Sequence, residues 1–242
     1  MAQFSILKSL KKMKPPTCTA VIAAAGISAR CEGEDKLFYT INDKPVLAYT
    51  LDAFENCTLV NDIIVVAHED RINSIVELCS TYGYKKVSKV MKGGATRPES
   101  VMNGIFAASN KATLIAIHDG ARPCIDVGII EETIHKAAKY NAAAPAVAIA
   151  STVKMVEDSV ITKTVDREAL YEIQTPQIFR IELIKAALTK VLKKSIDITD
   201  DCMAIEMIGV PIHITEGSRR NIKITDNQDF RIVEALLNEE IN

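Results

Sequence analysis

The sequence of 242 residues contains no tryptophan, and aromatic residues make up only 5% of it. Such a low aromatic content argues against a stacking platform for single-stranded nucleic acid. An excess of one charge is also missing, because 29 lysines and arginines stand against 31 aspartates and glutamates, for a formal net charge of −2. This balance excludes a histone-like binder of polyanions and an acidic disordered tail. We therefore expect no nucleic-acid partner.

Long apolar runs and grouped cysteines are missing as well. No run approaches the roughly 18 apolar residues that a membrane span needs, so we expect no membrane partner. The six cysteines include no Cys-x-x-Cys pair and no Cys/His group at zinc-ligand spacing, which is typical of reduced thiols in a cytoplasmic protein. Residues 1–17 are basic, but their apolar stretch Phe4–Leu7 is too short for a signal peptide, and we interpret them as an N-terminal extension.

The rest of the chain alternates short apolar runs with amphipathic segments. The runs, which we expect to be β-strands, are Ala20–Ala25, Ile63–Ala67, Val87–Met91, Leu114–Ile117 and Ala144–Ala150. Uninterrupted apolar strands are typical of a parallel sheet that is covered on both faces, and the amphipathic segments between them suit crossover helices. The pattern therefore predicts one α/β domain over residues 18–240, with a mostly parallel sheet and helices on both faces.

Capping residues predict where several helices begin and end. Pro45 suits the first position of a helix, and a helix over Ile72–Tyr82 would end at Gly83. Asp126 suits the cap of a helix that runs to about residue 141. Thr225–Gln228 has the form of a capping box ahead of a C-terminal helix.

Residues 151–174 depart from this pattern. Thr152–Val156 and Val160–Val165 each alternate in polarity, and Glu157–Ser159 suits a turn between them, so we expect a β-hairpin. A hairpin inserted into a parallel α/β fold has little of its own to bury against. It either lies on the domain or reaches a second subunit.

In open α/β sheets, ligands bind beyond the carboxyl ends of the strands. The first apolar run is followed by small residues and then by Arg30 and Lys36. Small residues let backbone amides approach phosphate oxygens, and the two cations offer charge-assisted hydrogen bonds. The dinucleotide-binding fingerprint is absent because Ser28 occupies its second glycine position, which disfavours a dehydrogenase.

The third and fourth runs also end in residues suited to a site. The glycine pair Gly93–Gly94 precedes a helix start, which suits contacts with phosphates or base edges. The fourth run leads into Asp119, where a carboxylate suits Mg²⁺ that keeps its other positions for waters and substrate phosphates, and then into Arg122. If the strand extends through Asp119, His118 points to the opposite face and is structural.

Seven short motifs then occur together and in order: Ala23–Gly26 with Arg30 and Lys36, Gly93–Gly94 with Arg97 and Ser100–Val101, His118–Pro123, Thr164–Arg167, Gln174–Gln177, Ile198–Asp201, and Glu216–Ser218 with Asn221–Thr225. With these motifs the chain resembles the 2-C-methyl-D-erythritol 4-phosphate cytidylyltransferases, the CTP-using enzymes of the non-mevalonate isoprenoid route, over about residues 18–240. The resemblance implies a Rossmann-like fold, Mg²⁺, and a homodimer formed by exchanged hairpin arms over about residues 151–174.

The resemblance also implies roles for individual residues. The residues expected to catalyse the transfer are Arg30 and Lys36 on the phosphates and Lys223 on the α-phosphate. Those expected to bind CTP are Ala24, Ala25, Gly26, Gly93, Gly94, Ser100 and Asp119, with Asp119 also the metal ligand. Those expected to bind the polyol phosphate are Arg122, Thr175, Thr199 and, from the neighbouring subunit's arm, Thr152 and Arg167.

The implied reaction suits these residue types. A phosphate oxygen of the second substrate attacks the α-phosphorus of CTP in line, and pyrophosphate leaves. The attacking oxygen is already anionic near neutral pH, so the reaction needs no histidine or carboxylate base. Catalysis has to come from positioning and from cations aimed at the developing charge.

Other interpretations remain open. A related cytidylyltransferase would act on ribitol 5-phosphate, although Gly120–Ala121 favours methylerythritol phosphate. A catalytically silent nucleotide-binding protein is disfavoured, because it would have no use for Lys36 and Lys223. Arg167 has an alternative as a surface ion pair, and Asp200–Asp201 suits a helix N-terminus that begins at Thr199. The chain also departs from the family's pattern at Ser28, Leu37 and Arg219–Arg220.

Overall fold

The computed structural model describes residues 16–26 and 35–239. The strands are β1 (Cys18–Ala24), β2 (Thr40–Ile41), β3 (Lys44–Pro45), β4 (Val60–Ala67), β5 (Val87–Lys92), β6 (Leu114–Asp119), β7 (Ala142–Ala148), β8 (Lys154–Glu157), β9 (Val160–Thr164), β10 (Tyr171–Ile173), β11 (Gln177–Arg180) and β12 (His213–Glu216). The helices are α1 (Val46–Asn56), the short 3₁₀ helix η2 (Glu69–Arg71), α2 (Ile72–Tyr82), α3 (Arg97–Ala107), α4 (Val127–Tyr140), α5 (Ile181–Lys194), α6 (Asp201–Glu206) and α7 (Asn227–Glu239).

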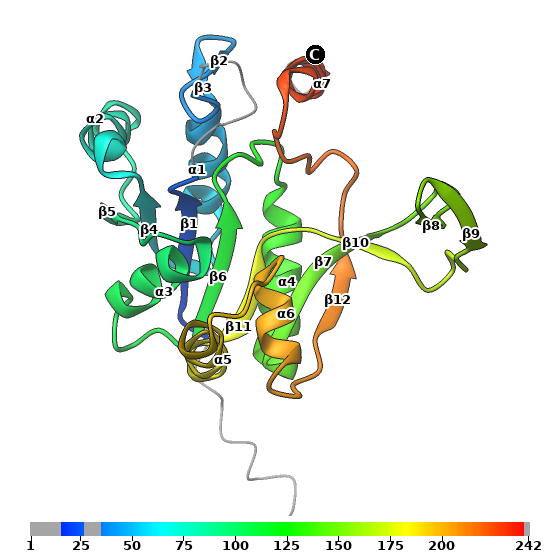
Figure 1. Cartoon of the computed structure of the whole chain (residues 1–242). Helices are drawn as coiled ribbons and strands as arrows, with labels where there is room; N and C mark the ends of the chain where they lie inside the picture. The colour runs from blue at the N-terminus through cyan, green and yellow to red at the C-terminus, as the bar shows by residue number, and fades with distance from the viewer. Residues whose placement is uncertain (1–15, 27–34, 240–242) are drawn as a thin grey trace, which may run out of the picture.

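An eight-stranded sheet forms the centre of the molecule (Figure 1). Its strands follow the order β10-β7-β11-β6-β1-β4-β5, and β12 pairs with β7. The pairs of β1 with β4 and β6, of β4 with β5, and of β7 with β12 are parallel, whereas β10 and β11 pair antiparallel with their neighbours. The five predicted strands form, and the expected α/β fold with a mostly parallel sheet is confirmed.

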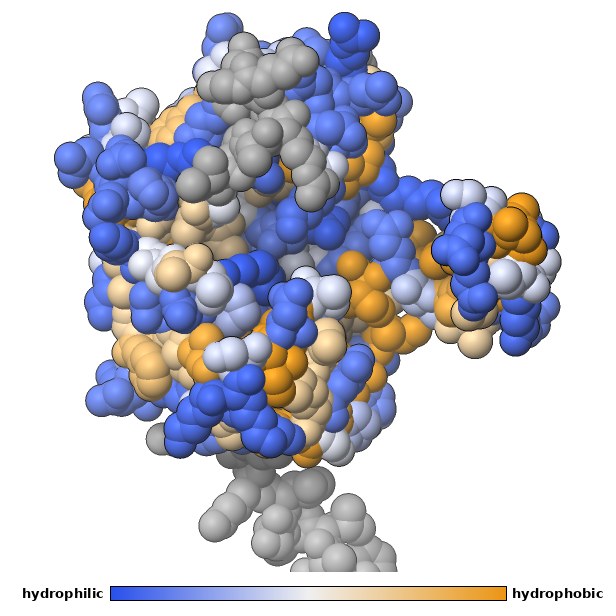
Figure 2. All heavy atoms as spheres, viewed as in Figure 1, coloured by the Kyte–Doolittle hydropathy of each residue, from blue (hydrophilic) through white to orange (hydrophobic). Residues whose placement is uncertain are grey.

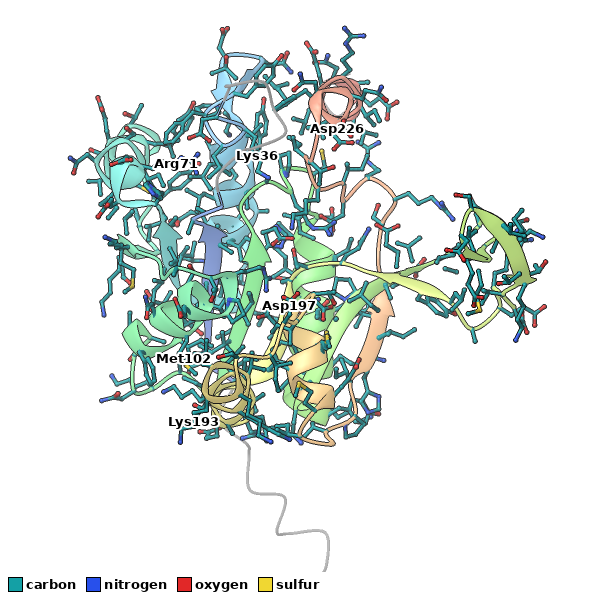
Figure 3. All side chains as sticks on the ribbon, in the orientation of Figure 1. Lys36, Arg71, Met102, Lys193, Asp197 and Asp226 are labelled. Atoms are coloured by element: carbon teal, nitrogen blue, oxygen red, sulfur yellow. The ribbon has the colours of Figure 1, made fainter. Side chains whose placement is uncertain are left out.

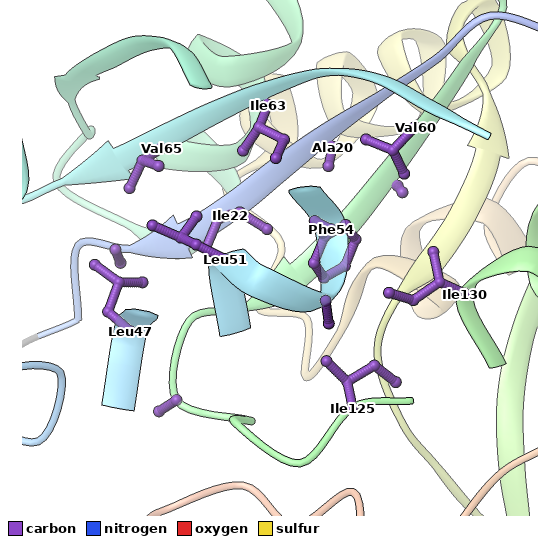
Figure 4. Close-up of a cluster of buried hydrophobic side chains, with 14 of the residues drawn as sticks. Ala20, Ile22, Leu47, Leu51, Phe54, Val60, Ile63, Val65, Ile125 and Ile130 are labelled. Atoms are coloured by element: carbon purple, nitrogen blue, oxygen red, sulfur yellow. The ribbon is translucent and has the colours of Figure 1, made fainter. Parts of the chain in front are cut away.

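Helices cover both faces of the sheet, and a separate apolar core lies under each group. One core takes Leu47, Leu51 and Phe54 of α1, and helices α2, α4 and α7 also contribute to it, whereas α3, α5 and α6 pack on the other core. Successive residues of β1 alternate between them, so Ile22 belongs to the first core and Val21 to the second. Figure 4 shows α1 packed on the sheet at the first core. Two covered faces explain why the inner strands β1 and β6 are buried along almost their whole length.

The predicted helix boundaries hold with shifts of a residue or so. Helix α2 ends at Gly83, whose φ of 69° is left-handed, and Asp126 caps α4 by accepting a hydrogen bond from the Gly128 amide. Pro45 precedes α1 and is not its first residue, because it pairs with Thr40 as the end of β3. The N-terminal cap of α7 is Asp226, one residue later than expected. Its carboxylate accepts hydrogen bonds from the backbone amides of Gln228 and Asp229.

The expected hairpin forms from β8 and β9, and we call residues 154–164 the arm. Its strands pair antiparallel, and Asp158 and Ser159 turn between them with positive φ angles. The arm projects away from the sheet in Figure 1, and every residue of both strands is exposed. Val160 and Ile161 are 63% and 62% exposed, and Figure 2 shows apolar residues on the surface of the arm.

Among the described residues, no helix is long and apolar enough to cross a membrane.

Candidate active site

The carboxyl ends of the central parallel strands meet at one edge of the sheet. Ala24 at the end of β1 is the register partner of Ala67 in β4, and Ala23 is the partner of Asp119 in β6. A cleft of about 490 Å³ opens there, which we call the strand-end cleft. Its lining includes Ala24, Ala25, Gly26, Lys36, His68, Gly94, Arg97, Ser100, Asp119 and Lys223. The structure thus brings most of the predicted CTP-binding residues together.

A second cleft of about 500 Å³ lies at the end of β7, and we call it the β7 cleft. It is lined by Arg122, residues 147–151, Glu172, Gln174, Arg219, residues 221–223 and Thr225. Lys223 lines both clefts. The Lys223 side chain is therefore placed to contact a ligand in either cleft.

The glycine turn after β5 packs directly against the exit of β1. A side chain at Gly93 would place its Cβ 2.6 Å from the Ser100 hydroxyl oxygen and 2.9 Å from the Ala25 Cβ, so only glycine fits. The Ser100 hydroxyl, which is 3% exposed, accepts a hydrogen bond from the Gly94 amide at 3.0 Å and donates one to the Thr96 carbonyl at 2.9 Å. Ser100 therefore holds the turn in shape at the wall of the cleft.

Asp119 lies among three cations. Its Oδ2 is 3.0 Å from Lys223 Nζ and 3.4 Å from Arg122 Nε, and its Oδ1 is 3.7 Å from Arg97 Nη2. Burial by itself would raise the pKa of Asp119, but Lys223, Arg97 and Arg122 together lower that pKa well below its usual range. The carboxylate is therefore ionised at any physiological pH.

A second carboxylate stands behind Arg97. Asp201 is fully buried, and its Oδ2 is 2.8 Å from Arg97 Nη2. Burial raises the pKa of Asp201, an effect that Arg97 opposes. The sequence interpretation is confirmed for Asp200, which caps α6 through the Met203 amide, although α6 begins at Asp201 and not at Thr199. The ion pair with Arg97 was missed, because Arg97 and Asp201 lie in two separate motifs and no local pattern joins them.

The Lys36 side chain reaches the segment that carries Lys223. Lys36 Nζ donates to the Ile224 carbonyl at 3.3 Å, and the Ile224 amide donates to the Ala121 carbonyl at 2.9 Å. Arg122 Nη1 donates to the Asn221 carbonyl at 2.7 Å. These contacts join three distant parts of the sequence at the cleft. Arg30 lies outside the described residues.

Thr175 is part of a buried network and lines neither cleft. The Asp119 amide donates to the Thr175 hydroxyl oxygen at 3.2 Å, and that hydroxyl lies 3.0 Å from Nδ1 of His118. The Arg122 carbonyl lies 3.5 Å from Nε2 and can only accept a hydrogen bond, so the proton of the neutral imidazole is on Nε2. Nδ1 is then the acceptor for the Thr175 hydroxyl. Because β6 runs through Asp119, His118 points to the opposite face as expected and is fully buried, and this burial lowers its pKa to about 3.

The structure does not bring the remaining predicted residues to either cleft of this chain. Thr152 and Arg167 are exposed on the segments that flank the arm, and the Arg167 guanidinium donates to the Ala150 carbonyl. Thr199 is also exposed, and its hydroxyl lies 3.9 Å from the sulfur of Met203. None of the three lines the strand-end cleft or the β7 cleft.

His68 and Arg219 are two of the lining residues that were not assigned from the sequence. His68 lines the strand-end cleft from the end of β4, but its neighbours in sequence carried no motif. Arg219 lines the β7 cleft and donates to the Ala148 carbonyl at 3.1 Å, and its only signal was a departure from the family's pattern. Among the described residues, no group of three or more histidine, cysteine or acidic side chains is placed to hold a metal ion.

Comparison with known proteins identifies close relatives. The family model described as 2-C-methyl-D-erythritol 4-phosphate cytidylyltransferase matches residues 18–239. A protein of that name from Clostridium acetobutylicum is 41% identical over 221 residues, which cover 90% of this chain and 96% of the relative. Another, from Halalkalibacterium halodurans, is 38% identical over 223 residues, which cover 92% of this chain and 97% of the relative.

Solved structures give the same result. The crystal structure of 4-diphosphocytidyl-2C-methyl-D-erythritol synthase from Anaerococcus prevotii matches with a TM-score of 0.83 at 28% identity, covering 93% of this chain and all of the other. A 2-C-methyl-D-erythritol 4-phosphate cytidylyltransferase from Thermus thermophilus matches with a TM-score of 0.73 at 29% identity, covering 90% of this chain and 98% of the other.

Proposed function

We propose that this chain, which belongs to the 2-C-methyl-D-erythritol 4-phosphate cytidylyltransferase family, transfers the cytidylyl group of CTP to 2-C-methyl-D-erythritol 4-phosphate. The products are 4-diphosphocytidyl-2-C-methyl-D-erythritol and pyrophosphate. The observation that carries the proposal is the convergence of Lys223, Arg97 and Arg122 on Asp119, beside the strand-end cleft that Lys36 also lines. Family membership favours this polyol phosphate over ribitol 5-phosphate.

CTP would occupy the strand-end cleft. The backbone after β1, over residues 24–26, and the Lys36 ammonium line the part suited to the triphosphate. Gly93 approaches β1 too closely for a side chain, and Ser100 fixes the neighbouring amide, so this wall suits a flat base and its ribose. Arg30, in the segment between Gly26 and Asp35, would add a further phosphate contact.

The bond-forming step depends on positively charged side chains more than on a general base. The incoming phosphate monoester is an anion that approaches another polyanion, and cations have to offset that repulsion. Lys223 lines both clefts, so its ammonium is suited to contact the α-phosphate and the attacking phosphate together. The neutral His118 is held by Thr175 and faces away from the cleft, which suits a structural role and not that of a base.

The polyol phosphate would occupy the β7 cleft, which Arg122 lines and where its guanidinium lies beside Asp119. Thr152 and Arg167 are proposed to reach the same ligand from a second copy of the chain, through exchange of the arms. The exposed apolar residues of the arm support a homodimer, because they gain a partner surface only in an assembly. Thr199 would contact the polyol, and Thr175 would act on the site through Asp119.

A divalent metal, preferably Mg²⁺, fits the donor set at Asp119. An ionised carboxylate at a strand end, without a cluster of further protein ligands among the described residues, is the arrangement in which Mg²⁺ keeps waters and substrate phosphates as its other ligands. Asp119 would hold the ion. When bound, Mg²⁺ would neutralise phosphate charge and help to orient the triphosphate.

The test is a measurement of pyrophosphate release from CTP in the presence of Mg²⁺. 2-C-methyl-D-erythritol 4-phosphate and ribitol 5-phosphate are supplied in separate reactions, and the product is identified by mass spectrometry. We expect turnover with the methylerythritol substrate at a kcat/KM at least tenfold above that for the ribitol substrate. No turnover with either substrate would refute the enzymatic function, and a preference for ribitol 5-phosphate would reverse the assignment of the substrate.

A further inference from the structure

Arg71 contacts Gly26, which lines the strand-end cleft, although no motif includes Arg71. It is the last residue of η2, four positions beyond the end of β4. Strands β4 and β1 pair in parallel with Ala67 beside Ala24, so the segments that follow them leave the sheet side by side. Figure 3 labels Arg71 and Lys36 at this end of the sheet.

The Arg71 guanidinium joins two segments of the cleft. Its Nη1 donates to the Gly26 carbonyl at 2.9 Å, and its Nε forms an ion pair with Oδ2 of Asp35. Gly26 lines the cleft just beyond β1, and Asp35 immediately precedes Lys36. The Arg71 side chain therefore connects Gly26 with the residue before Lys36. Gly26 and Lys36 are the two residues expected to contact the triphosphate on either side of this connection.

Asp35 in turn fixes the backbone that carries Lys36. Its Oδ1 accepts a hydrogen bond from the Leu37 amide at 3.1 Å. Its backbone carbonyl accepts hydrogen bonds from the amides of Phe38 and Tyr39 at 2.9 Å each. These bonds form a tight turn with Lys36 at its second position. The turn directs the Lys36 ammonium into the cleft, where it reaches the Ile224 carbonyl.

We propose that Arg71 is a positioning residue for the nucleoside triphosphate, holding Gly26 and the Asp35–Lys36 turn at a fixed separation. The inference rests on the proposed function, because that function assigns Gly26 and Lys36 to the triphosphate. Arg71 acts through these residues, because its guanidinium is bonded to the Gly26 carbonyl and to the Asp35 carboxylate. The side chains of Arg71 and Asp35 are 16% and 27% exposed, so this ion pair is partly shielded from water and keeps a defined geometry. The value of the contact lies in ordering the cleft before the ligand binds.

The test compares Arg71→Met, Asp35→Asn and the double variant. Each single change should weaken CTP binding, measured by titration calorimetry without the second substrate, by about tenfold and should lower kcat by a similar factor. The double variant should bind CTP no more weakly than Arg71→Met alone, because that change already removes the ion pair that Asp35→Asn breaks. Arg71→Lys should recover part of the loss, since an ammonium keeps the charge but does not reproduce both contacts of the guanidinium.

Glu69→Gln is the matched control. Glu69 lies on the same short helix and forms an exposed ion pair with Lys92, so this change should leave CTP binding, kcat and the melting temperature as in the wild type. Unchanged CTP affinity in both Arg71→Met and Asp35→Asn would overturn the proposal, as would additive losses in the double variant. If the wild type binds CTP but does not turn over, the proposed function fails, while the calorimetric comparison still decides the role of Arg71.

Discussion

The strand-end cleft and the β7 cleft differ in how their charged groups are arranged. The strand-end cleft brings together Lys36, Arg97, Asp119 and Lys223 from different parts of the sequence, and both Arg97 and Lys223 pair with Asp119. The β7 cleft is lined by Arg122, Arg219 and Lys223 together with residues 147–151, which lead toward the exposed arm. Under the proposed function, the charges for phosphate chemistry are organised within one chain, whereas a second chain is proposed to take part in selecting the second substrate.

The difference has an electrostatic origin. At the strand-end cleft, buried Asp119 and Asp201 hold Arg97 and Lys223 in place before any phosphate arrives, so little reorganisation is needed when the charge develops. Arg167 lacks a comparable setting in its own chain, where it is exposed and donates to a backbone carbonyl. A solvated arginine gives a strong phosphate contact only when a second surface excludes water from it.

The largest effect is expected from removing the cations of the strand-end cleft. Lys36→Ala or Lys223→Ala should lower kcat by about 10²–10³-fold, because each removes a charge aimed at the transition state. The affinity for CTP should fall much less. Steady-state kinetics and CTP titration measure the two quantities, with Lys111→Ala at an exposed loop position as the control. Equal losses in affinity and in kcat/KM, with kcat unchanged, would contradict a transition-state role.

A smaller and more selective effect is expected from the flank of the arm. Arg167→Ala should raise the KM for the polyol phosphate by about 30-fold, as expected for the loss of one charge-assisted phosphate contact. Its affinity for CTP should match that of the wild type. Arg231→Ala, at an exposed position on α7, is the control. A loss of CTP affinity in Arg167→Ala would mean that the two clefts do not divide the substrates in this way.

The apolar face of the arm should affect assembly and not the fold of the single chain. Ile161→Ser should raise the dimer dissociation constant by about tenfold, because a side chain that is 62% exposed in one chain would lose its apolar contact in the dimer. Analytical ultracentrifugation over a range of protein concentrations measures this constant. Ile232→Ser, which changes a 47% exposed residue on α7, serves as the matched control. Equal constants for the two variants would remove the arm from the interface.

The last effect concerns folding stability and the buried network behind the strand-end cleft. Burial lowers the pKa of His118 to about 3, below its unfolded value of 6.5, so the unfolded chain binds the extra proton between these limits. The stability that neutral His118 provides is therefore complete above pH 6.5 and is lost as the pH falls, by at most about 1.4 kcal/mol per pH unit. Urea unfolding from pH 7 to pH 4.5 should give a shallower decline for His118→Gln than for the wild type. The control is His135→Gln at an exposed position, and an equally steep decline in His118→Gln would contradict the assignment.

The sequence predicts the local features of the fold and of the strand-end cleft, but not the contacts between residues far apart in the chain. The strands, the helix ends at Gly83 and Asp126, and the positions of Lys36 and Asp119 follow from local patterns, because strand ends and caps are set by neighbouring residues. The pairing of Arg97 with Asp201 joins residues about a hundred positions apart, and no local pattern reports such a contact. The same holds for the contact of Arg71 with Asp35, which arises from the register of β1 and β4.

A complementation assay tests the division between the two clefts most directly. Lys36→Ala impairs the body of one chain and Arg167→Ala impairs the segment that flanks its arm, so a mixed dimer contains one site in which both parts are intact. After subunit exchange, confirmed by native mass spectrometry of differently tagged chains, random mixing should give half of the dimers in mixed form. At a polyol phosphate concentration well below the wild-type KM, where Arg167→Ala homodimers contribute little, the mixture should show about a quarter of the wild-type activity. That recovery is the predicted result. Activity no higher than the average of the two parent variants, with mixed dimers present, would contradict a site shared between two chains.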